Sequence, residues 1–573
     1  MSWGQSEPVR EPFPAILDLR ELDGHTGFVV NGEFSRDGFG RSATGAGDVN
    51  GDGLDDLLFG SPFASPQGRY RAGQAFVLFG RDSTAGALFP PSIDGAMLAG
   101  EDGFRLFGIT RFAGSNARGV GDINGDGLDD FALSEGVSVY VVFGRDTGFP
   151  DTLDLASFSS EDGFRVETQA SRLAGLGDIN GDGIPDVAVG SLYADPDGRI
   201  DAGSCYIIFG RNTATQGPFP DVLDVQSLDG EIGFRIDGAE AGDQLGLGLA
   251  FGGDLNDDGI DDLLLGAFRA SPDGRDRAGE AYIVFGRDSS ASGAFPAALS
   301  LAELAAGDGV RMPGALANDG AGLSVGLAGD LNGDRIDDAI IGASNALIDG
   351  RGRPGVAYVV YGRAESAGGL PPQIELADLD GTQGFVMLGV ADRDRTGFAA
   401  VAVGDINGDG VGDVGIGAFY ANLTDPYSPA AGKAFVVFGR GSDAPRPFPA
   451  RLDLGDLDGR DGFTAQSWES LDTCGIDIGA AGDVNGDGFD DLVIGADRTN
   501  LGGASLPGRA FVVFGRDTCL ADLDLDGQAT IFDFLAFQNL FDAGDPKADF
   551  DGDGNFTVFD FLLFQNAFDA GCR

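Results

Sequence analysis

One acidic pattern recurs seven times along the chain: Asp-x-Asn-x-Asp, followed by another aspartate four residues further on. In the first copy Asp48, Asn50, Asp52 and Asp56 occupy loop positions 1, 3, 5 and 9, and the backbone carbonyl of Leu54 falls at position 7. Alternate positions of a tight loop converge on one point. Carboxylate, amide and carbonyl oxygens in irregular geometry suit Ca²⁺ better than Mg²⁺. The sequence therefore predicts seven calcium loops and about seven bound Ca²⁺ ions.

The predicted ligands in the other six copies follow the same order. They are Asp122, Asn124, Asp126, Leu128 and Asp130; Asp178, Asn180, Asp182, Ile184 and Asp186; Asp254, Asn256, Asp258, Ile260 and Asp262; Asp330, Asn332, Asp334, Ile336 and Asp338; Asp405, Asn407, Asp409, Val411 and Asp413; and Asp483, Asn485, Asp487, Phe489 and Asp491.

The spacing of the copies indicates the architecture. Successive first aspartates lie 74, 56, 76, 76, 75 and 78 residues apart, which suits a four-stranded propeller blade with long loops. An apolar, β-rich run ending in Phe/Tyr-Gly-Arg follows every loop, and a Gly-Phe pair precedes all but one. We therefore predict an all-β, seven-bladed β-propeller over residues 13–517, after an N-terminal tail of residues 1–12. Because the last unit ends at Arg516 without a segment like that at Phe13, the N-terminal strand is expected to complete the seventh blade.

These repeats resemble the FG-GAP repeats of the integrin α-subunit β-propeller. Phe39-Gly40 before the first loop and Phe59-Gly60 after it stand where the two signatures of that family sit. The resemblance implies that each calcium loop joins strands one and two of its blade, and that the propeller serves adhesion or recognition. Two departures stand out: Arg335 replaces the loop glycine in the fifth copy, and the second copy lacks the long segment after Asp130.

Residues 518–573 form a different, α-helical module with two loops of EF-hand type. Positions 1, 3, 5, 7, 9 and 12 hold Asp522, Asp524, Asp526, Gln528, Thr530 and Asp533, and then Asp549, Asp551, Asp553, Asn555, Thr557 and Asp560. Each loop runs into an apolar segment expected to be helical, residues 532–541 and 559–568.

This module resembles the dockerin module, which implies two further Ca²⁺ ions and a cohesin-like partner. It departs from dockerins at loop positions 10 and 11, where Ile531-Phe532 and Val558-Phe559 replace small hydroxyl residues. A self-contained calcium-stabilised cap is the alternative.

The four cysteines fall into two groups. Cys519 and Cys572 bracket the C-terminal module, and a disulfide between them would stabilise it by roughly 4 kcal/mol on the loop-entropy account. Cys205 and Cys474 belong to blades far apart around the ring, so we predict buried thiols.

A ligand could bind on the face opposite the calcium loops, where the connections between strands two and three would emerge. Arginine and tyrosine, which commonly anchor interfaces, gather in these connections. The candidates are Arg69, Tyr70, Arg71, Tyr193, Arg199, Arg269, Arg275, Arg277, Arg351, Arg353, Tyr420, Tyr427 and Arg498. The alternative is that these arginines pair with neighbouring aspartates and order long loops.

Composition excludes several function classes. A net charge of −54 opposes binding to nucleic acid, and no stretch is long and apolar enough to span a membrane. The single histidine, His25, lies in a turn, and neither a zinc cluster, a nucleophile elbow nor a phosphate-binding loop occurs, so the sequence predicts a protein that is not an enzyme.

No signal peptide is readable at the N-terminus, yet calcium loops of this kind suit an extracellular or cell-surface protein, so we expect a truncated or mature chain. The predicted function is extracellular, calcium-dependent adhesion or recognition of a protein or glycan, with the C-terminal module docking to a partner. The alternative is a non-catalytic glycan-binding component of a carbohydrate-active or cell-surface assembly.

Overall fold

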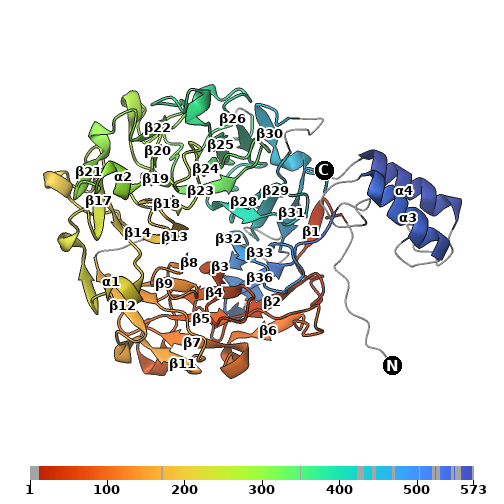
Figure 1. Ribbon diagram of the computed structural model, residues 1–573, viewed down its shortest axis with the longest axis horizontal. Coiled ribbons are helices and arrows are strands. Elements are labelled where there is room, and N and C mark those ends of the chain that lie inside the picture. The colour runs from red at the N-terminus through yellow and green to blue at the C-terminus, as the bar shows by residue number, and fades with distance from the viewer. Residues whose placement is uncertain are drawn as a thin grey trace.

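The computed structural model describes residues 12–168, 172–348, 350–422, 431–441, 447–467, 472–501, 504–518, 523, 530–543, 548 and 557–570. Within these ranges the strands form seven sheets arranged around a central axis, together with one separate hairpin (Figure 1). The first strands of consecutive blades contact one another around the axis. The predicted seven-bladed β-propeller is confirmed.

Each blade has four antiparallel strands. In blade one these are β3 (Ser42–Gly47), β4 (Asp56–Ser61), β5 (Gln74–Leu78) and β7 (Gly103–Phe107), in order from the axis outwards. A short fifth strand, β11 (Thr152–Asp154), pairs in parallel with β7 at the outer edge. This fifth strand comes from the next repeat. Each repeat therefore runs first to the outer edge of the preceding blade and then supplies the fourth strand of its own blade.

The remaining blades repeat this order. Blade two has β8 (Ala117–Gly121), β9 (Asp130–Glu135), β10 (Ser138–Val142), β12 (Gly163–Glu167) and β16 (Val222–Asp224); blade three has β13 (Arg172–Gly177), β14 (Asp186–Ser191), β15 (Ser204–Ile208), β17 (Gly233–Asp237) and β21 (Ala298–Ser300); blade four has β18 (Gly248–Phe251), β19 (Leu263–Ala267), β20 (Glu280–Val284) and β22 (Gly309–Pro313). Blade five has β23 (Ser324–Gly329), β24 (Asp338–Ala343), β25 (Val356–Val360), β26 (Gly384–Leu388) and β30 (Arg451–Asp453); blade six has β27 (Ala400–Gly404), β28 (Asp413–Ala418), β29 (Lys433–Val437), β31 (Gly462–Gln466) and β1 (Ile16–Asp18); blade seven has β32 (Asp477–Gly482), β33 (Asp491–Ala496), β36 (Arg509–Val513), β2 (Gly27–Asn31) and β6 (Ser92–Asp94).

The N-terminal segment closes the ring at two blades. Strand β2 pairs antiparallel with β36, with Gly27 opposite Val513, and so supplies the outer strand of blade seven. Strand β1 pairs in parallel with β31 of blade six, with Ile16 opposite Thr464. The prediction that the N-terminal strand completes the seventh blade is confirmed, and the contact with blade six is an addition to it.

The repeat marks converge in one packing unit at the outer part of every blade except blade four, where Val310 replaces the phenylalanine. In the first unit the Phe28 ring of the Gly-Phe pair stacks on Phe89, with centroids 4.3 Å apart, and the Arg81 guanidinium lies 5.1 Å from the Phe89 ring centre. The unit that closes the ring is assembled from both ends of the propeller: Phe13 stacks on Phe463 at 4.5 Å and receives Arg516 at 4.1 Å. Stacked and cation–π contacts each stabilise such a unit by about 0.5–1.5 kcal/mol.

Two of the departures noted in the sequence have clear structural outcomes. Strands β9 and β10 are joined by Gly136 and Val137 alone, so blade two lacks a long connection, as predicted. Arg335 adopts a left-handed φ of 72° and its amide still donates to Asp330, at 2.6 Å, so the loop keeps its path despite the missing glycine.

Other elements are small. A hairpin of β34 (Thr499–Leu501) and β35 (Ala504–Leu506) lies in the connection of blade seven, and α1 (Thr213–Gln216) and α2 (Ser289–Ser292) follow the third strands of blades three and four. In the C-terminal region α3 (Ile531–Ala543) packs on α4 (Val558–Ala570) through stacked Phe537 and Phe564 rings, 4.1 Å apart. Both helices run slightly longer than the sequence predicts. Among the described helices, none combines the length and apolar character needed to cross a bilayer.

Candidate functional site: acidic loops and the opposite face

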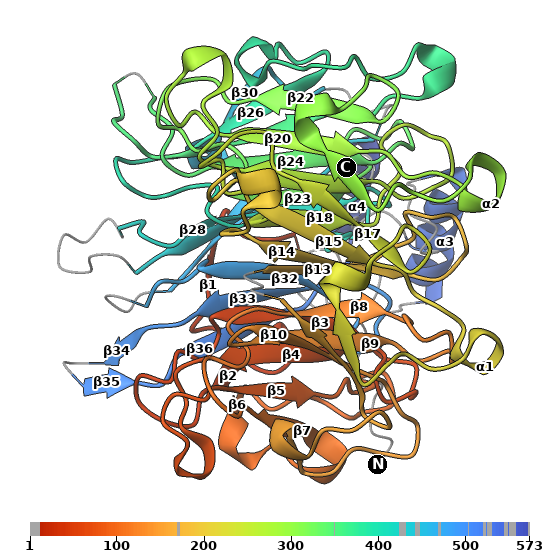
Figure 2. The same cartoon turned by 90° about the vertical axis from the view of Figure 1, so that its left-hand side faces the viewer.

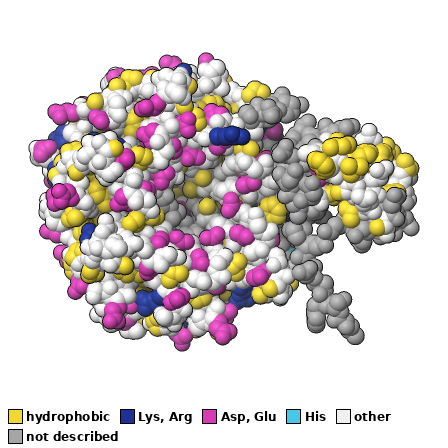
Figure 3. Space-filling model, in the orientation of Figure 1, with side chains coloured by type: hydrophobic (Ala, Val, Ile, Leu, Met, Phe, Trp, Pro, Cys, Tyr) yellow, Lys and Arg dark blue, Asp and Glu magenta, His cyan; other side chains and the backbone are white. Residues whose placement is uncertain are grey.

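The seven acidic loops join the first and second strands of their blades and therefore share one face of the ring. The connections between strands two and three lie on the other face: Figure 2 shows the β34–β35 hairpin projecting on one side and α1 and α2 on the opposite side. Figure 3 views the ring along its axis and shows acidic side chains spread widely over the visible face, with few basic ones.

Each loop winds around its first aspartate. The Asp48 carboxylate accepts hydrogen bonds from the amides of Gly51, Asp52 and Gly53, at 2.7, 3.0 and 2.8 Å. The Asp52 amide also donates to the Asn50 side-chain oxygen at 2.8 Å. These bonds draw the side chains at positions 1, 3 and 5 to the inside of one turn, as the sequence pattern predicts.

The aspartate at position 9 is buried and is the first residue of the second strand, except that Asp262 directly precedes β19 in blade four. Asp56 accepts hydrogen bonds from the Val49 amide, at 3.0 Å, and from the Gly80 amide of the Phe-Gly-Arg mark, at 2.9 Å. Burial, reinforced by repulsion from Asp52 and Asp48, raises the pKa of Asp56 to about 8. The same desolvation raises the pKa of the equivalent aspartates, namely Asp130, Asp186, Asp262, Asp338, Asp413 and Asp491.

The residues present fit a bound cation of the Ca²⁺ type. In the second loop the Asn124 side-chain oxygen is buried and has no hydrogen-bond partner among the described residues, although it occupies ligand position 3. A buried polar oxygen without a partner costs about 1–3 kcal/mol, which a cation would offset. Among the described residues no group of three or more Asp, Glu, His or Cys side chains forms a metal site by itself, so amide and backbone oxygens would have to complete the coordination. Calcium binding stays a prediction.

Hydrogen bonds between blades use loop residues that are not among the predicted calcium ligands. The aspartate at position 8 accepts a hydrogen bond from the amide of the first aspartate in the preceding blade: Asp129 from Asp48 at 2.9 Å, for example. Equivalent bonds run to Asp55, Asp261, Asp337 and Asp490, whereas Pro185 and Gly412 occupy this position in blades three and six. The recurrence of Asp-Asp at positions 8 and 9 is the signal that could have revealed them.

The arginine of every Phe-Gly-Arg mark adds a second bond between blades. Its amide donates to the carbonyl at position 2 of the preceding loop, as from Arg145 to Val49 at 2.9 Å. The glycine before it is required by close approach, since a Cβ on Gly144 would lie 2.4 Å from the Asp129 carbonyl oxygen. Loop order, blade order and ring closure are therefore coupled, and any ion that orders a loop would also stabilise the joint between two blades.

In the C-terminal module only part of the predicted ligand set lies within the described residues. The Asp533 carboxylate is buried and accepts the Thr530 amide at 2.7 Å, and Asp560 accepts the Thr557 amide at 2.7 Å. These bonds connect positions 9 and 12 at the start of each helix. Outside the described residues lie Asp522, Asp524, Asp526, Gln528, Asp549, Asp551, Asp553, Asn555, Cys519 and Cys572.

The candidate ligand-face arginines divide into two groups. Arg69 donates to both oxygens of Asp154, at 2.7 and 2.6 Å, and Arg351 pairs in the same way with Asp453. Arg275 bonds Glu375 at 2.9 Å and Arg199 lies 3.4 Å from Asp197. For these four the alternative of loop-ordering ion pairs describes the structure. The candidates on the surface are Tyr70, Arg71, Tyr193, Arg269, Arg277, Arg353, Tyr420 and Arg498, while Tyr427 lies outside the described residues.

Two minor predictions concern single residues. Cys205 and Cys474 are buried free thiols, as expected, and burial raises the pKa of both above the ordinary range for cysteine. His25 is exposed in a turn held by the Asp23 carboxylate, which accepts the His25 amide at 2.9 Å.

The fold is a seven-bladed β-propeller with an acidic loop in every blade, and comparison with known proteins shows which repeat it resembles. The FG-GAP repeat matches residues 39–78, 171–208 and 477–506. Integrin alpha-4 of Xenopus laevis is 32% identical over 161 residues, which cover 27% of this chain and 14% of that protein. Integrin alpha-PS2 of Drosophila melanogaster is 31% identical over 182 residues, or 29% of this chain and 12% of that protein. Three segments of this β-propeller thus match the FG-GAP repeat, and the chain covers less than a fifth of the length of these integrin relatives.

The comparisons correct the prediction that the chain is not an enzyme. Phosphatidylinositol-glycan-specific phospholipase D of Bos taurus is 32% identical over 174 residues, which cover 30% of this chain and 18% of that protein. Repeats of this kind therefore occur in an enzyme as well as in integrins. The missing nucleophile and zinc motifs do not separate these two classes, because the matched repeats are only a small part of the enzyme.

Proposed function

We propose that this chain is an extracellular recognition propeller that binds a protein ligand on the face opposite its acidic loops, with Ca²⁺ stabilising the ring. The observation that carries the proposal is where the large apolar side chains are exposed. In the propeller most of them lie in the connections on that one face: Phe34, Phe63, Tyr70, Val137, Tyr193, Ile200, Leu316, Leu347 and Tyr420.

The cluster on blade one is the best-formed part of this face. Tyr70 is 81% exposed, and the Arg71 guanidinium lies 5.8 Å from its ring centre and 5.5 Å from that of Phe63. Phe63 in turn meets Phe112 edge to face at 5.8 Å. An exposed aromatic group backed by a fixed arginine is the type of side-chain set that dominates interface energetics. The integrin relatives support a ligand-binding or adhesion role for the propeller.

Binding assays with the intact chain test this proposal. An array of extracellular-matrix proteins and a glycan array are probed with wild type, with Tyr70→Ala plus Tyr193→Ala, and with the control Leu88→Ala, whose side chain is 40% exposed in the connection after β5, on the side of the acidic loops. We expect a protein hit that the double variant weakens by at least about tenfold and the control leaves unchanged, the size of one hot-spot loss. Equal binding by the double variant would contradict the proposed face.

Binding to glycans alone would instead support the second candidate, a glycan-binding component of a carbohydrate-active or cell-surface assembly. The same aromatic cluster favours it, since apolar ring faces stack on sugar rings. The double variant distinguishes this case as well, because only a glycan hit lost with Tyr70 and Tyr193 would assign the face to sugars.

The C-terminal helices carry a second apolar surface that fits a docking role. Ile531, Phe532 and Leu535 of α3 and Val558 and Leu562 of α4 are exposed. Corresponding residues of the two repeats are exposed together, at 531 with 558 and at 535 with 562. Phe532, which is 66% exposed, lies outside the contact between the helices, so its replacement should leave the module folded while weakening any docking.

A further inference from the structure

The propeller axis holds a cavity of about 530 Å³. Its walls are the innermost strands of all seven blades. Three arginines line it, Arg41, Arg118 and Arg172, each at or near the start of the first strand of blades one, two and three. These strand ends lie away from the acidic loops. In a chain of net charge −54, three guanidinium groups in one cavity need a specific reason.

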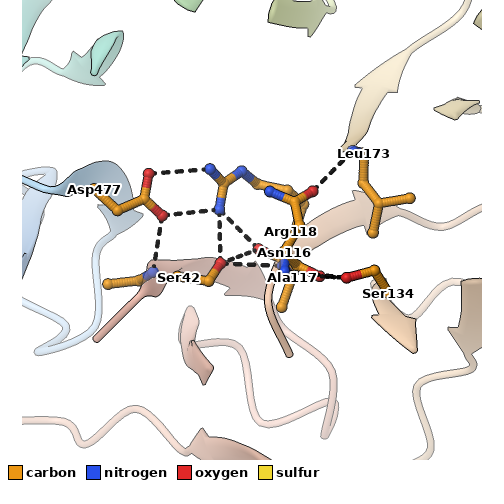
Figure 4. A network of polar contacts seen from close by, with 8 residues as sticks. Ser42, Asn116, Ala117, Arg118, Ser134, Leu173 and Asp477 are labelled. Atoms are coloured by element: carbon orange, nitrogen blue, oxygen red, sulfur yellow. Dashed lines mark hydrogen bonds and ion pairs between the residues drawn. The ribbon is translucent and has the colours of Figure 1, made fainter. Parts of the chain in front are cut away.

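Two of the three arginines have a carboxylate partner. Arg118 donates to both oxygens of Asp477, at 3.1 Å each, and to the Ser42 hydroxyl at 2.9 Å (Figure 4). Arg41 lies 3.3 Å from an oxygen of Asp497. These bonds tie blades seven, one and two together and hold both guanidinium groups in place.

Arg172 differs, because its side chain has no hydrogen-bond or ion-pair partner among the described residues. The backbone next to Arg172 is held in place, because the amide of Leu173 donates to the Asn116 side-chain oxygen at 2.8 Å (Figure 4). Burial lowers the pKa of Arg172 to about 10, with repulsion from Arg41 and Arg118 adding to the effect and attraction to Asp477 opposing it. At neutral pH the group remains a cation that no carboxylate among the described residues contacts directly.

The opposite wall of the cavity is apolar. Blades four, five and six contribute Leu249, Leu323, Val325, Phe398 and Val401. A ligand that satisfies both walls carries a compact anionic group at one end and an apolar body at the other. The planar guanidinium fork matches a carboxylate with two parallel hydrogen bonds.

We propose that the end of the cavity at Arg172 is a binding site for a carboxylate attached to an apolar group, with Arg172 as its partner and the ion pairs of Arg118 and Arg41 forming the adjacent wall. The site opens on the same face as the exposed aromatic side chains but uses other residues, and small-molecule binding tests it whether or not a macromolecular ligand is found.

Isothermal titration calorimetry of the intact chain with benzoate, acetate and inorganic phosphate provides the test. Arg172→Gln removes the unpaired charge, and Arg165→Gln is the matched control, because Arg165 lies on the outer strand β12 and pairs with Glu167. We expect wild type to bind benzoate more tightly than acetate or phosphate, and Arg172→Gln to weaken benzoate binding by about tenfold to a hundredfold, the size of one charged hydrogen-bonded contact.

The control should match wild type, and the calcium-dependent melting of all three proteins should coincide. Benzoate binding that survives Arg172→Gln would overturn the proposal, as would a wild type that binds no carboxylate. Phosphate binding tighter than benzoate would overturn the assignment to an apolar carboxylate.

Discussion

Phe13 offers the sharpest test of how the ring is closed. Its ring is 3% exposed, stacks on Phe463 of blade six and receives the Arg516 guanidinium from the end of blade seven. Phe13→Ala should therefore lower the free energy of unfolding by about 3–5 kcal/mol, as for other buried phenylalanines. Phe13→Leu keeps most of the apolar volume and loses only the stacking and cation–π contacts, so it should cost about 1–2 kcal/mol.

Guanidinium chloride unfolding followed by circular dichroism, in saturating calcium, measures both changes. Phe34→Ala is the matched control, because that ring is 58% exposed in the same N-terminal part of the chain and its loss should change stability by less than about 0.5 kcal/mol. If Phe13→Ala also stays within about 0.5 kcal/mol of wild type, the N-terminal segment does not hold the ring closed and the reasoning fails.

Three further predictions concern the loops. Asp182→Ala removes a position-5 carboxylate of blade three and should reduce the gain in melting temperature on adding calcium, whereas the exposed Asp221→Ala should not; equal gains would refute the ligand assignment. Asp129→Ala removes the acceptor for the Asp48 amide and should cost about 1–3 kcal/mol in denaturant unfolding, with Asp129→Asn costing less because it keeps an oxygen acceptor; an unchanged alanine variant would show that the bond between blades is not stabilising. Arg335→Gly relieves a left-handed φ of 72° and should raise stability by about 0.5–1 kcal/mol; a lower melting temperature would show that the arginine side chain makes a larger contribution than the strain.

The sequence predicts the blade number and loop positions because both repeat. Gly80 and Asp56 have counterparts at one fixed place in every blade, and Phe28 has them in all but blade four, where Val310 stands. Ring closure was predictable from the missing terminal segment. The excursion of β1 to the rim of blade six was not, because a three-residue strand carries no pattern of its own and its partner Thr464 lies over 400 residues away.

The ligand face and the cavity on the axis depend on ion pairs between residues far apart in the sequence, which no local sequence pattern predicts. Arg69 pairs with Asp154, 85 residues further on, because the fifth strand, which ends at Asp154, lies at the edge of the previous blade. Asp477, from the other end of the chain, accepts hydrogen bonds from Arg118, and among the described residues Arg172 has no such partner. The charge count and the motifs would be the same whether or not an arginine forms an ion pair. The sequence therefore could not distinguish an arginine in a structural ion pair from one that can bind a ligand.

The central proposal is that calcium orders the seven loops and, through them, the contacts between neighbouring blades. The most direct measurement is the calcium content of the purified chain by mass spectrometry, combined with its melting temperature in calcium and in chelator. We expect about seven ions from the propeller, with additional ions from the C-terminal module, and a melting temperature that falls clearly when they are removed. A chain that binds no calcium and melts at the same temperature in chelator would contradict the account.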